Sequence, residues 1–331
     1  VTRSWKATNE TTDDISAYFS CVNWGKKSIV LDINDETQLE QLYALVKTAD
    51  FIITSYKPGD DLKLKVDYET LKLINPRIIY GQISGYGALA DRVGYDAIIQ
   101  GEVGFMHING EANSKPLKMP VALMDLLAGH QLKEAMLVGY IQLLKTGLGG
   151  KYEVSLVEAG LASLANQATN YLVAGNDPES KGSLHPNIAP YGECFRTKDG
   201  KKLIVAVGNN KQFNSLLKLL NIRLEDDFES NVDRVKNRQK LFKILSNAIV
   251  ERESIALLEQ LKMENIPVGQ INKVSEAIDL YGSFIKIESG GGLKGLRSFV
   301  ANSSKFKNTS HLLPPPHLGE HTHQILTSLS I

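Results

Sequence analysis

An alternation of β-rich runs and helical patterns between residues 28 and 84 most constrains the fold of this 331-residue chain. Runs rich in Ile, Val and Tyr predict three strands, at 28–32, 50–55 and 77–84. Apolar residues at helical spacing predict the two helices between them, at 34–48 and 68–74. Repeats of this kind place parallel strands in one sheet with helices on its faces. The sequence therefore predicts an α/β fold with a doubly wound, Rossmann-like parallel sheet.

The rest of the chain predicts a smaller second domain and a returning arm. Apolar residues nearly encircle the helical pattern at 131–145, so we expect that helix to be buried. A breaker-rich stretch at 186–190 marks a boundary. Beyond it we expect an α+β domain with a strand at 202–207, a helix at 212–220, helices over 234–264 and a turn at 265–270. We therefore divide the chain into a large domain (1–188), a small domain (189–285) and an arm (286–331) that returns to the large domain. Before these, the sequence also predicts a strand at 152–156 and a helix at 159–173.

Charge and cysteine usage narrow the classes of function. Lys plus Arg and Asp plus Glu both number 37, so the formal net charge is zero, which argues against a nucleic-acid or anionic-membrane surface. No apolar run approaches membrane-spanning length. Cys21 and Cys194 suit a reducing compartment and have no metal-ligand spacing. His317, His321 and His323 cluster without an acidic or thiol partner in the sequence, so we expect no metal.

Two glycine-rich stretches resemble nucleotide-binding loops and do not satisfy their requirements. Residues 85–90 fit G-x-G-x-x-A, but residues 91–96 interrupt the helix that this fingerprint needs, and the preceding strand is the third. Residues 145–151 lack the first glycine of a phosphate loop, and Tyr152 stands where Ser or Thr should follow the lysine. We therefore expect neither ATP nor NAD, and no other cofactor.

A single carboxylate, Asp125, follows the apolar run 121–124 and precedes a long helical pattern. Desolvating a carboxylate is costly unless it is hydrogen-bonded or has a chemical task. Asp125 could be a helix N-cap, a position that aspartate fills well. It could also be a reactive group, and the residues around it leave both interpretations open.

Motifs along almost the whole chain resemble CoA-transferase family III, the CaiB/BaiF group. They include VTRSW, NWGKKSIVLDI, ADFIITSYKPG, NPRIIYGQISGYG, GYDAIIQGEVGFMHING, HPNIAPYGECFRTKDGKKLIVAVGNNKQF, ENIPVGQIN and PPPHLGEHT. The stretch MPVALMDLLAGH around Asp125 resembles the family's PxxDxxxG. Each motif alone is weak, and their common order makes the resemblance specific. GYDAIIQGEVGFMHING, SSKFK and PPPHLGEHT look most similar to the mitochondrial succinyl-CoA:glutarate (hydroxymethylglutarate) branch.

The resemblance implies an interlaced homodimer, in which each protomer threads through the other. It also implies that the family's first strand–helix unit, which contributes to the CoA site, is missing before VTRSW. A sheet without that unit would expose an apolar edge or face, which puts the activity of the shortened chain in question. We expect a mitochondrial location from the branch resemblance alone.

The resemblance also implies roles for individual residues. Asp125 falls at the position of the nucleophile that exchanges acyl groups and CoA through an anhydride and an aspartyl-CoA thioester. CoA thioesters and small carboxylic acids are then substrates. Tetrahedral oxyanions would be stabilised by backbone N–H groups. The positions that match the family's CoA-binding and thioester-facing segments are Leu31, Asn34, Ser55, Tyr56, Lys57, Lys63, Val93, Gly94, Tyr95 and Asp96.

Two alternatives stay open at this point. Some relatives racemise 2-methylacyl-CoA with a His/Asp pair, but here Tyr95 occupies the position of that histidine, and tyrosine is a poor base near neutral pH. A non-catalytic CoA-binding homologue is the second alternative. A dicarboxylate substrate would need a cation in the acyl pocket, and Arg92 and His107 lie near the matching segments.

Overall fold

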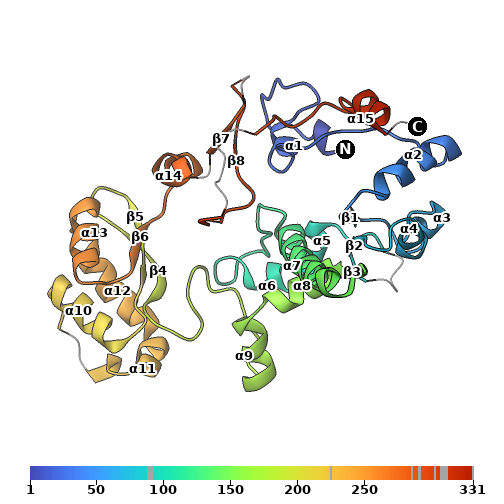
Figure 1. Cartoon of the computed structure of the whole chain (residues 1–331). Coiled ribbons are helices and arrows are strands. Elements are labelled where there is room, and N and C mark those ends of the chain that lie inside the picture. The colour runs from blue at the N-terminus through green and yellow to red at the C-terminus, as the bar shows by residue number, and fades with distance from the viewer. Residues whose placement is uncertain are drawn as a thin grey trace. The chain divides into compact units, whose positions relative to one another are not determined.

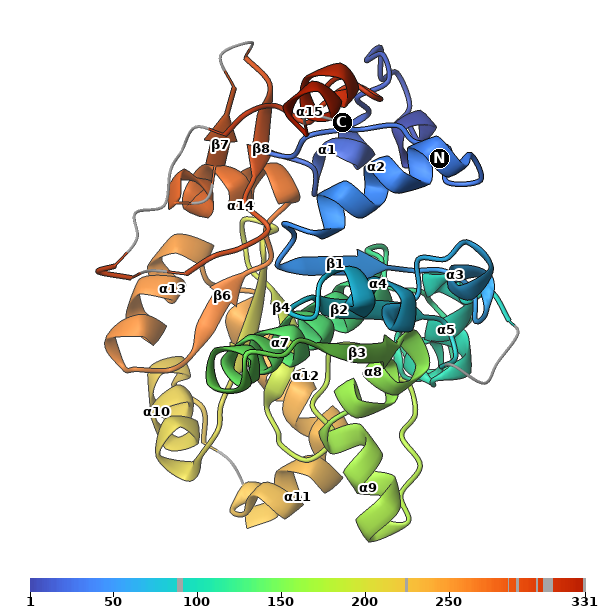
Figure 2. The same cartoon turned by 45° about the vertical axis from the view of Figure 1, so that its right-hand side comes forward.

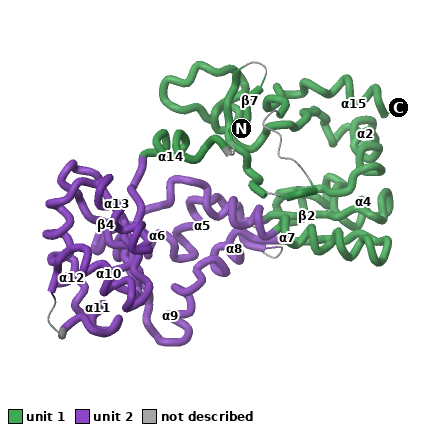
Figure 3. Tube along the Cα trace, turned by 60° about the vertical axis from the view of Figure 1, so that its left-hand side comes forward, with its two compact units in different colours: residues 1–83, 132–153, 273–331 green, residues 84–131, 154–272 purple. Residues whose placement is uncertain are grey.

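The computed structural model describes residues 1–87, 92–223, 226–284, 286–289, 292–301, 303–305 and 312–329. The 85–90 loop and the 289–292 glycine run lie partly outside them. The chain divides into two compact units (Figure 3). Unit 1 comprises 1–83, 132–153 and 273–331, and unit 2 comprises 84–131 and 154–272.

Unit 1 contains a three-stranded sheet in the order β1 (Phe51–Thr54), β2 (Ile79–Ser84) and β3 (Gly150–Ser155) (Figure 2). Strands β1 and β2 are parallel, with Phe51 opposite Ile79. Helices α2 (Glu36–Val46) and α4 (Tyr68–Ile74) flank β1 in the chain. The carboxylates of Asp35 and Asp67 accept backbone N–H bonds at the two helix starts, as N-caps do. The α/β class and the predicted helix–strand–helix–strand order over 34–84 are therefore confirmed.

The longest helix, α7 (Leu123–Thr146), packs against β2 through its second half. A Cβ atom on Gly81 would lie 2.5 Å from Sδ of Met136, which shows how closely the helix approaches this strand. The opposite side of this half is not covered by the part of the chain that the structure describes: Leu137, Val138, Ile141 and Leu144 are more than half exposed. The prediction that this helix is buried all round is wrong for the single chain.

The predicted strand at 28–32 is also wrong. Its backbone bonds to the C-terminal arm instead of to a sheet. His321 N donates to Ser28 O (2.9 Å), and Val30 N donates to Oγ1 of Thr322 (3.0 Å). Figures 1 and 2 accordingly show α15 (Thr322–Ser328) beside the N-terminal segment. The β-rich composition of 28–32 did not reveal this partner, which lies about 290 residues further along the chain.

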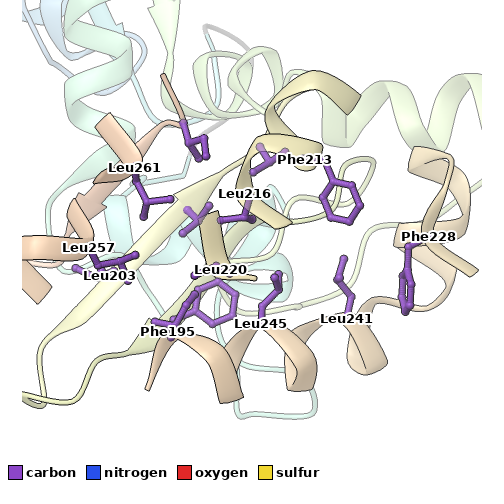
Figure 4. Close-up of a cluster of buried hydrophobic side chains, with 14 residues drawn as sticks. Phe195, Leu203, Phe213, Leu216, Leu220, Phe228, Leu241, Leu245, Leu257 and Leu261 are labelled. Carbon is purple, nitrogen blue, oxygen red and sulfur yellow. The ribbon is translucent and has the colours of Figure 1, made fainter. Parts of the chain in front are cut away.

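Unit 2 contains an antiparallel sheet of β4 (Tyr191–Arg196), β5 (Lys202–Ala206) and β6 (Val268–Gln270). Helices α10 (Asn210–Leu220), α12 (Arg238–Ile249) and α13 (Ser254–Met263) pack on it around a core of 14 buried apolar residues (Figure 4). The sequence prediction missed β4 and assigned 268–270 to a turn. The second error arises because Pro267 and Gly269 look like breakers, although both fit an edge strand.

The remaining elements are short. Unit 1 also holds η1 (Thr2–Ser4), α1 (Ala17–Ser20), α3 (Asp60–Lys63), α14 (Val274–Tyr281), η3 (Gly282–Phe284), β7 (Lys286–Glu288) and β8 (Lys294–Leu296). Unit 2 also holds α5 (Asp96–Glu102), α6 (Phe105–Ile108), α8 (Leu156–Ser163), α9 (Asn166–Ala174), η2 (Asp226–Phe228) and α11 (Asn231–Lys236). The helix predicted at 159–173 is two helices, because Ala165 between them has φ 49°. None of the described helices has the length and apolar character needed to cross a membrane.

The three-part domain division stays a prediction. Its boundary at 188 lies inside unit 2, and its arm lies inside unit 1.

Candidate active site

Asp125 lies in the first turn of α7, as the third residue of that helix. It is therefore not an N-cap, and the N-cap interpretation is wrong. The residue is exposed, and among the residues that the structure describes none forms a hydrogen bond or ion pair with its carboxylate. A free carboxylate at a helix start is available to react, and the helix dipole favours its ionised form.

The cap of α7 comes from another helix. Asp96, the first residue of α5, accepts a hydrogen bond from the backbone N–H of Met124 through Oδ1 (2.8 Å). Its Oδ2 accepts from Nε2 of Gln100 (2.8 Å), and Nζ of Lys118 lies 3.9 Å from that oxygen. Two carboxylates thus lie at the start of α7. That of Asp96 is hydrogen-bonded to this start, and that of Asp125 is free.

The surroundings alter the acidity of Asp125. Partial desolvation by the protein, and secondly the negative charge of Asp96, raise the pKa of the Asp125 carboxyl above its ordinary value. The residue nevertheless stays exposed to solvent, so a substrate can reach its carboxylate. A more basic carboxylate is also a better nucleophile, so the shift suits covalent catalysis.

Close backbone contact fixes the segment before α5. A Cβ atom on Gly94 would lie 2.4 Å from Cα of Gly85, and one on Gly85 would lie 2.5 Å from Cα of Gly94. Only two glycines allow this approach. The neighbouring Val93 and Tyr95 are 48% and 67% exposed, so they face solvent and do not fill the core. Of the four predicted residues 93–96, the structure therefore brings Asp96 into direct contact with the start of the Asp125 helix.

The other predicted positions lie in unit 1. Leu31 and Asn34 precede α2, and Asn34 donates through both N and Nδ2 to Oδ1 of Asp32. Ser55, Tyr56 and Lys57 directly follow β1, at the carboxyl end of a parallel strand, where ligands bind in such sheets. Lys63 ends α3 and pairs with Asp60 (2.9 Å). Their CoA-binding roles stay predictions.

The sequence analysis did not decide which cationic residue would bind the second carboxylate of a dicarboxylate substrate. Arg92 forms an ion pair with Glu102 (2.7 Å) and lies over the Tyr86 ring, so its charge is already engaged. His107 is an exposed residue in the last turn of α6. Neither arrangement singles out one of them as the cation.

Gln100 is the residue at this site that the sequence prediction missed. Its signal was the spacing to Asp96, because residues four apart on a helix face each other.

Comparisons with known proteins agree with the motifs. Residues 1–322 match the model of CoA-transferase family III. A succinate–glutarate CoA-transferase of Agrobacterium fabrum is 35% identical over 95% of this chain and 81% of its own length. A succinyl-CoA:glutarate CoA-transferase of Mus musculus is 36% identical over 98% of this chain and 76% of its own.

A solved structure gives the same answer for the fold. The crystal structure of a CaiB/BaiF family protein from Brucella suis matches with a TM-score of 0.83 and 34% identity, covering 99% of this chain and 88% of that one. The resemblance inferred from the motifs is confirmed. The chain belongs to CoA-transferase family III, and it is a CoA-transferase.

Proposed function

We propose that this enzyme transfers CoA from succinyl-CoA to a dicarboxylic acid such as glutarate, with Asp125 as the nucleophile. The observation that carries the proposal is the free Asp125 carboxylate in the first turn of α7, with its raised pKa. The printed names of the relatives from Agrobacterium fabrum and Mus musculus support the substrate pair.

The proposed reaction needs no external energy source, because a thioester is exchanged for a thioester. The Asp125 carboxylate attacks the donor carbonyl, the C–S bond breaks, and CoA thiolate leaves a mixed anhydride. The thiolate then attacks the aspartyl carbonyl, which releases the donor acid and forms an aspartyl-CoA thioester. The acceptor carboxylate attacks that thioester and releases the thiolate again. The thiolate finally attacks the acceptor carbonyl of the new anhydride, giving the product acyl-CoA and free Asp125.

Each predicted CoA contact is part of this proposal. We propose that Leu31, Asn34, Ser55, Tyr56, Lys57 and Lys63 contact CoA and that residues 93–96 face the thioester. The position of residues 55–57 after a parallel strand supports this. A mitochondrial location is likewise proposed, and it rests on the motif resemblance alone.

The active enzyme is proposed to be an interlaced homodimer. Its support is the uncovered apolar surface on two helices, since exposed patches of this kind mark interfaces. On α7, Ile141 and Leu144 are 53% and 66% exposed. On α9, Leu172 and Val173 are 75% and 85% exposed. Sedimentation should give a dimer for the native chain and a monomer for Ile141→Asp/Leu144→Asp. Val232→Asp, at an apolar residue of α11 that is 74% exposed, is the control and should stay dimeric.

The activity test uses succinyl-CoA and a panel of free acids: glutarate, hydroxymethylglutarate, oxalate, formate and carnitine. Mass spectrometry would report each new acyl-CoA. We expect glutaryl-CoA from the native chain, none from Asp125→Asn, and normal amounts from Asp177→Asn, at an exposed aspartate of the same unit. Transfer to another acid alone would overturn the proposed acceptor. Transfer that survives in Asp125→Asn would overturn the nucleophile.

A further inference from the structure

Gln100 is a buried amide whose hydrogen bonds converge on the start of the Asp125 helix. Its side chain belongs to a residue with 0% exposure. Oε1 accepts from the backbone N–H of Met119 (2.9 Å), while Nε2 donates to Oδ2 of Asp96 (2.8 Å). Nε2 also lies 3.3 Å from Val121 O and 3.5 Å from Met119 O. One amide therefore holds both the segment that leads into α7 and the carboxylate that caps α7.

Two hydrogen bonds connect Gln100 to the residue before Asp125. The first joins Gln100 to Oδ2 of Asp96, and the second joins Oδ1 of Asp96 to Met124 N–H. No side chain at 121 or 122 can cap this helix, because both residues, Val121 and Ala122, are apolar. The first turn of α7 is thus placed from α5, and Gln100 fixes the carboxylate that places it.

The two ends of this amide are not interchangeable. Met119 N–H requires an acceptor, and the Asp96 carboxylate requires a donor, so the partners determine which end is oxygen and which is nitrogen. A carboxylate at this position could satisfy Met119 but would face Asp96 as a second anion. An apolar side chain would leave both partners unsatisfied in the interior.

We propose that Gln100 is a positioning residue for the CoA transfer, which it supports by holding Asp96 and the 119–121 segment so that Asp125 is correctly aimed. This inference rests on the proposed role of Asp125 as the nucleophile. It assigns Gln100 an effect on the chemical step, because small displacements of a reacting group cost rate more than binding.

The test is Gln100→Glu, which preserves shape and removes the donor. We expect kcat to fall by roughly 100-fold, the size known for misplaced reacting groups. KM for the acyl-CoA should change by less than about threefold, because a positioning effect falls on the chemical step. The ratio of variant to native activity should rise as the pH is lowered, since a protonated carboxyl can again donate to Asp96. The activities are divided by the folded fraction at each pH, measured by circular dichroism, because lower pH would also relieve a charge repulsion that merely unfolds the variant.

Exchanging the carboxylate at position 96 and the amide at position 100 gives an independent test of the inference. In Asp96→Asn/Gln100→Glu, the new amide can accept from Met124 N–H and donate to the new carboxylate, which still accepts from Met119 N–H. We expect the double variant to be about tenfold faster than either single variant, within the coupling measured for contacting residues. Should Gln100→Glu fail to fold, the double variant alone decides: a folded, active protein supports the inference, and a folded, inactive one overturns it.

Gln142→Glu is the matched control, because Gln142 is an exposed residue of α7 whose side chain, among the contacts described, accepts only from Tyr152 OH (3.2 Å). It should keep native kcat. A native enzyme without CoA transfer would refute the proposed function itself. An active native enzyme whose Gln100→Glu variant matches Gln142→Glu, or shows no rescue by the exchange, would refute only the role of Gln100.

Discussion

Asp96 bonds through its carboxylate to the backbone N–H of Met124 (2.8 Å), the residue directly before Asp125. The arrangement divides two tasks between two aspartates. Asp96 satisfies an unpaired N–H of the first turn, and Asp125 stays free for chemistry. The same proximity lets the charge of Asp96 act on the acidity of Asp125.

Asp96→Asn should shift the acid limb of the pH–kcat profile to lower pH. Desolvation and then the Asp96 charge raise the pKa of Asp125, so removing that charge lowers this pKa and keeps Asp125 ionised in more acidic solution. The shift should be partial, because desolvation remains. The profile is measured at saturating acyl-CoA, with Asp177→Asn as the control. An unmoved or upward-shifted limb would contradict the electrostatic coupling.

Gly94→Ala should destabilise the fold by about 1–3 kcal/mol, the usual cost of forcing atoms into a packed site. Its Cβ atom would lie 2.4 Å from Cα of Gly85, and backbone cannot turn away as a side chain can. Chemical denaturation measures the effect. Gly101→Ala is the control, since its Cβ would meet only Sδ of Met106 at 3.6 Å. Equal stability of the two variants would refute the close contact.

Glu193→Gln should change how stability varies with pH. Burial, only partly offset by Arg238, raises the pKa of Glu193 in the folded state. The charged form is therefore disfavoured by folding, and the native chain gains stability as the pH falls through the raised pKa towards the unfolded value. The variant lacks this gain. Its Tm relative to native should thus decrease as the pH falls through the raised pKa towards about 4.3, the ordinary pKa of Glu. Glu259→Gln, at an exposed residue of α13, is the control, and its Tm relative to native should not change with pH.

His317→Gln should loosen the C-terminal arm at low pH. The hydrogen bond that the His317 ring donates to the Asp14 carboxylate raises the pKa of His317, while Leu318 N–H and then His317 lower the pKa of Asp14. The raised histidine pKa means that its contribution is present below about pH 6.5 and is lost as the pH rises through the folded value. The pair is largely exposed, so the effect should be small.

Hydrogen exchange of residues 312–329 measures this effect on the arm. The native arm should become less protected as the pH rises, after correction for intrinsic exchange rates, and the variant should show little change. His323→Gln, at an exposed residue of α15, should behave as native. A native arm with pH-independent protection would contradict the prediction.

Local sequence patterns predicted most of the longer helices and strands of unit 1. They failed where the structure of a segment depends on a hydrogen-bond partner far away in the sequence. The strands at 51–54 and 79–84 and the helices at 36–46 and 68–74 follow from spacing and caps that lie within each segment. Residues 28–32 are as rich in β-forming residues as those strands. Their hydrogen bonds nevertheless go to residues 321 and 322, which are too distant in the sequence for a local pattern to reveal.

The same distinction holds at the site. Asp125 could be singled out because a lone carboxylate interrupts an apolar stretch. The residue that caps α7 could not be predicted, since Asp96 lies 29 positions before Asp125 and belongs to another helix. The predicted burial of residues 131–145 failed for a related reason, because periodicity reports an apolar surface without saying which chain covers it.

The contact between Gly85 and Gly94 restricts how sequences of this kind can diverge. In most packed pairs, a larger residue on one side is tolerated once its neighbour shrinks. Here neither neighbour can become smaller, so no second substitution within the pair can compensate for the first. Any drift must move the backbone that carries Tyr95 and Asp96. Paired glycines nine positions apart should therefore distinguish, in sequence alone, the homologues that keep this helix start from those that have abandoned it.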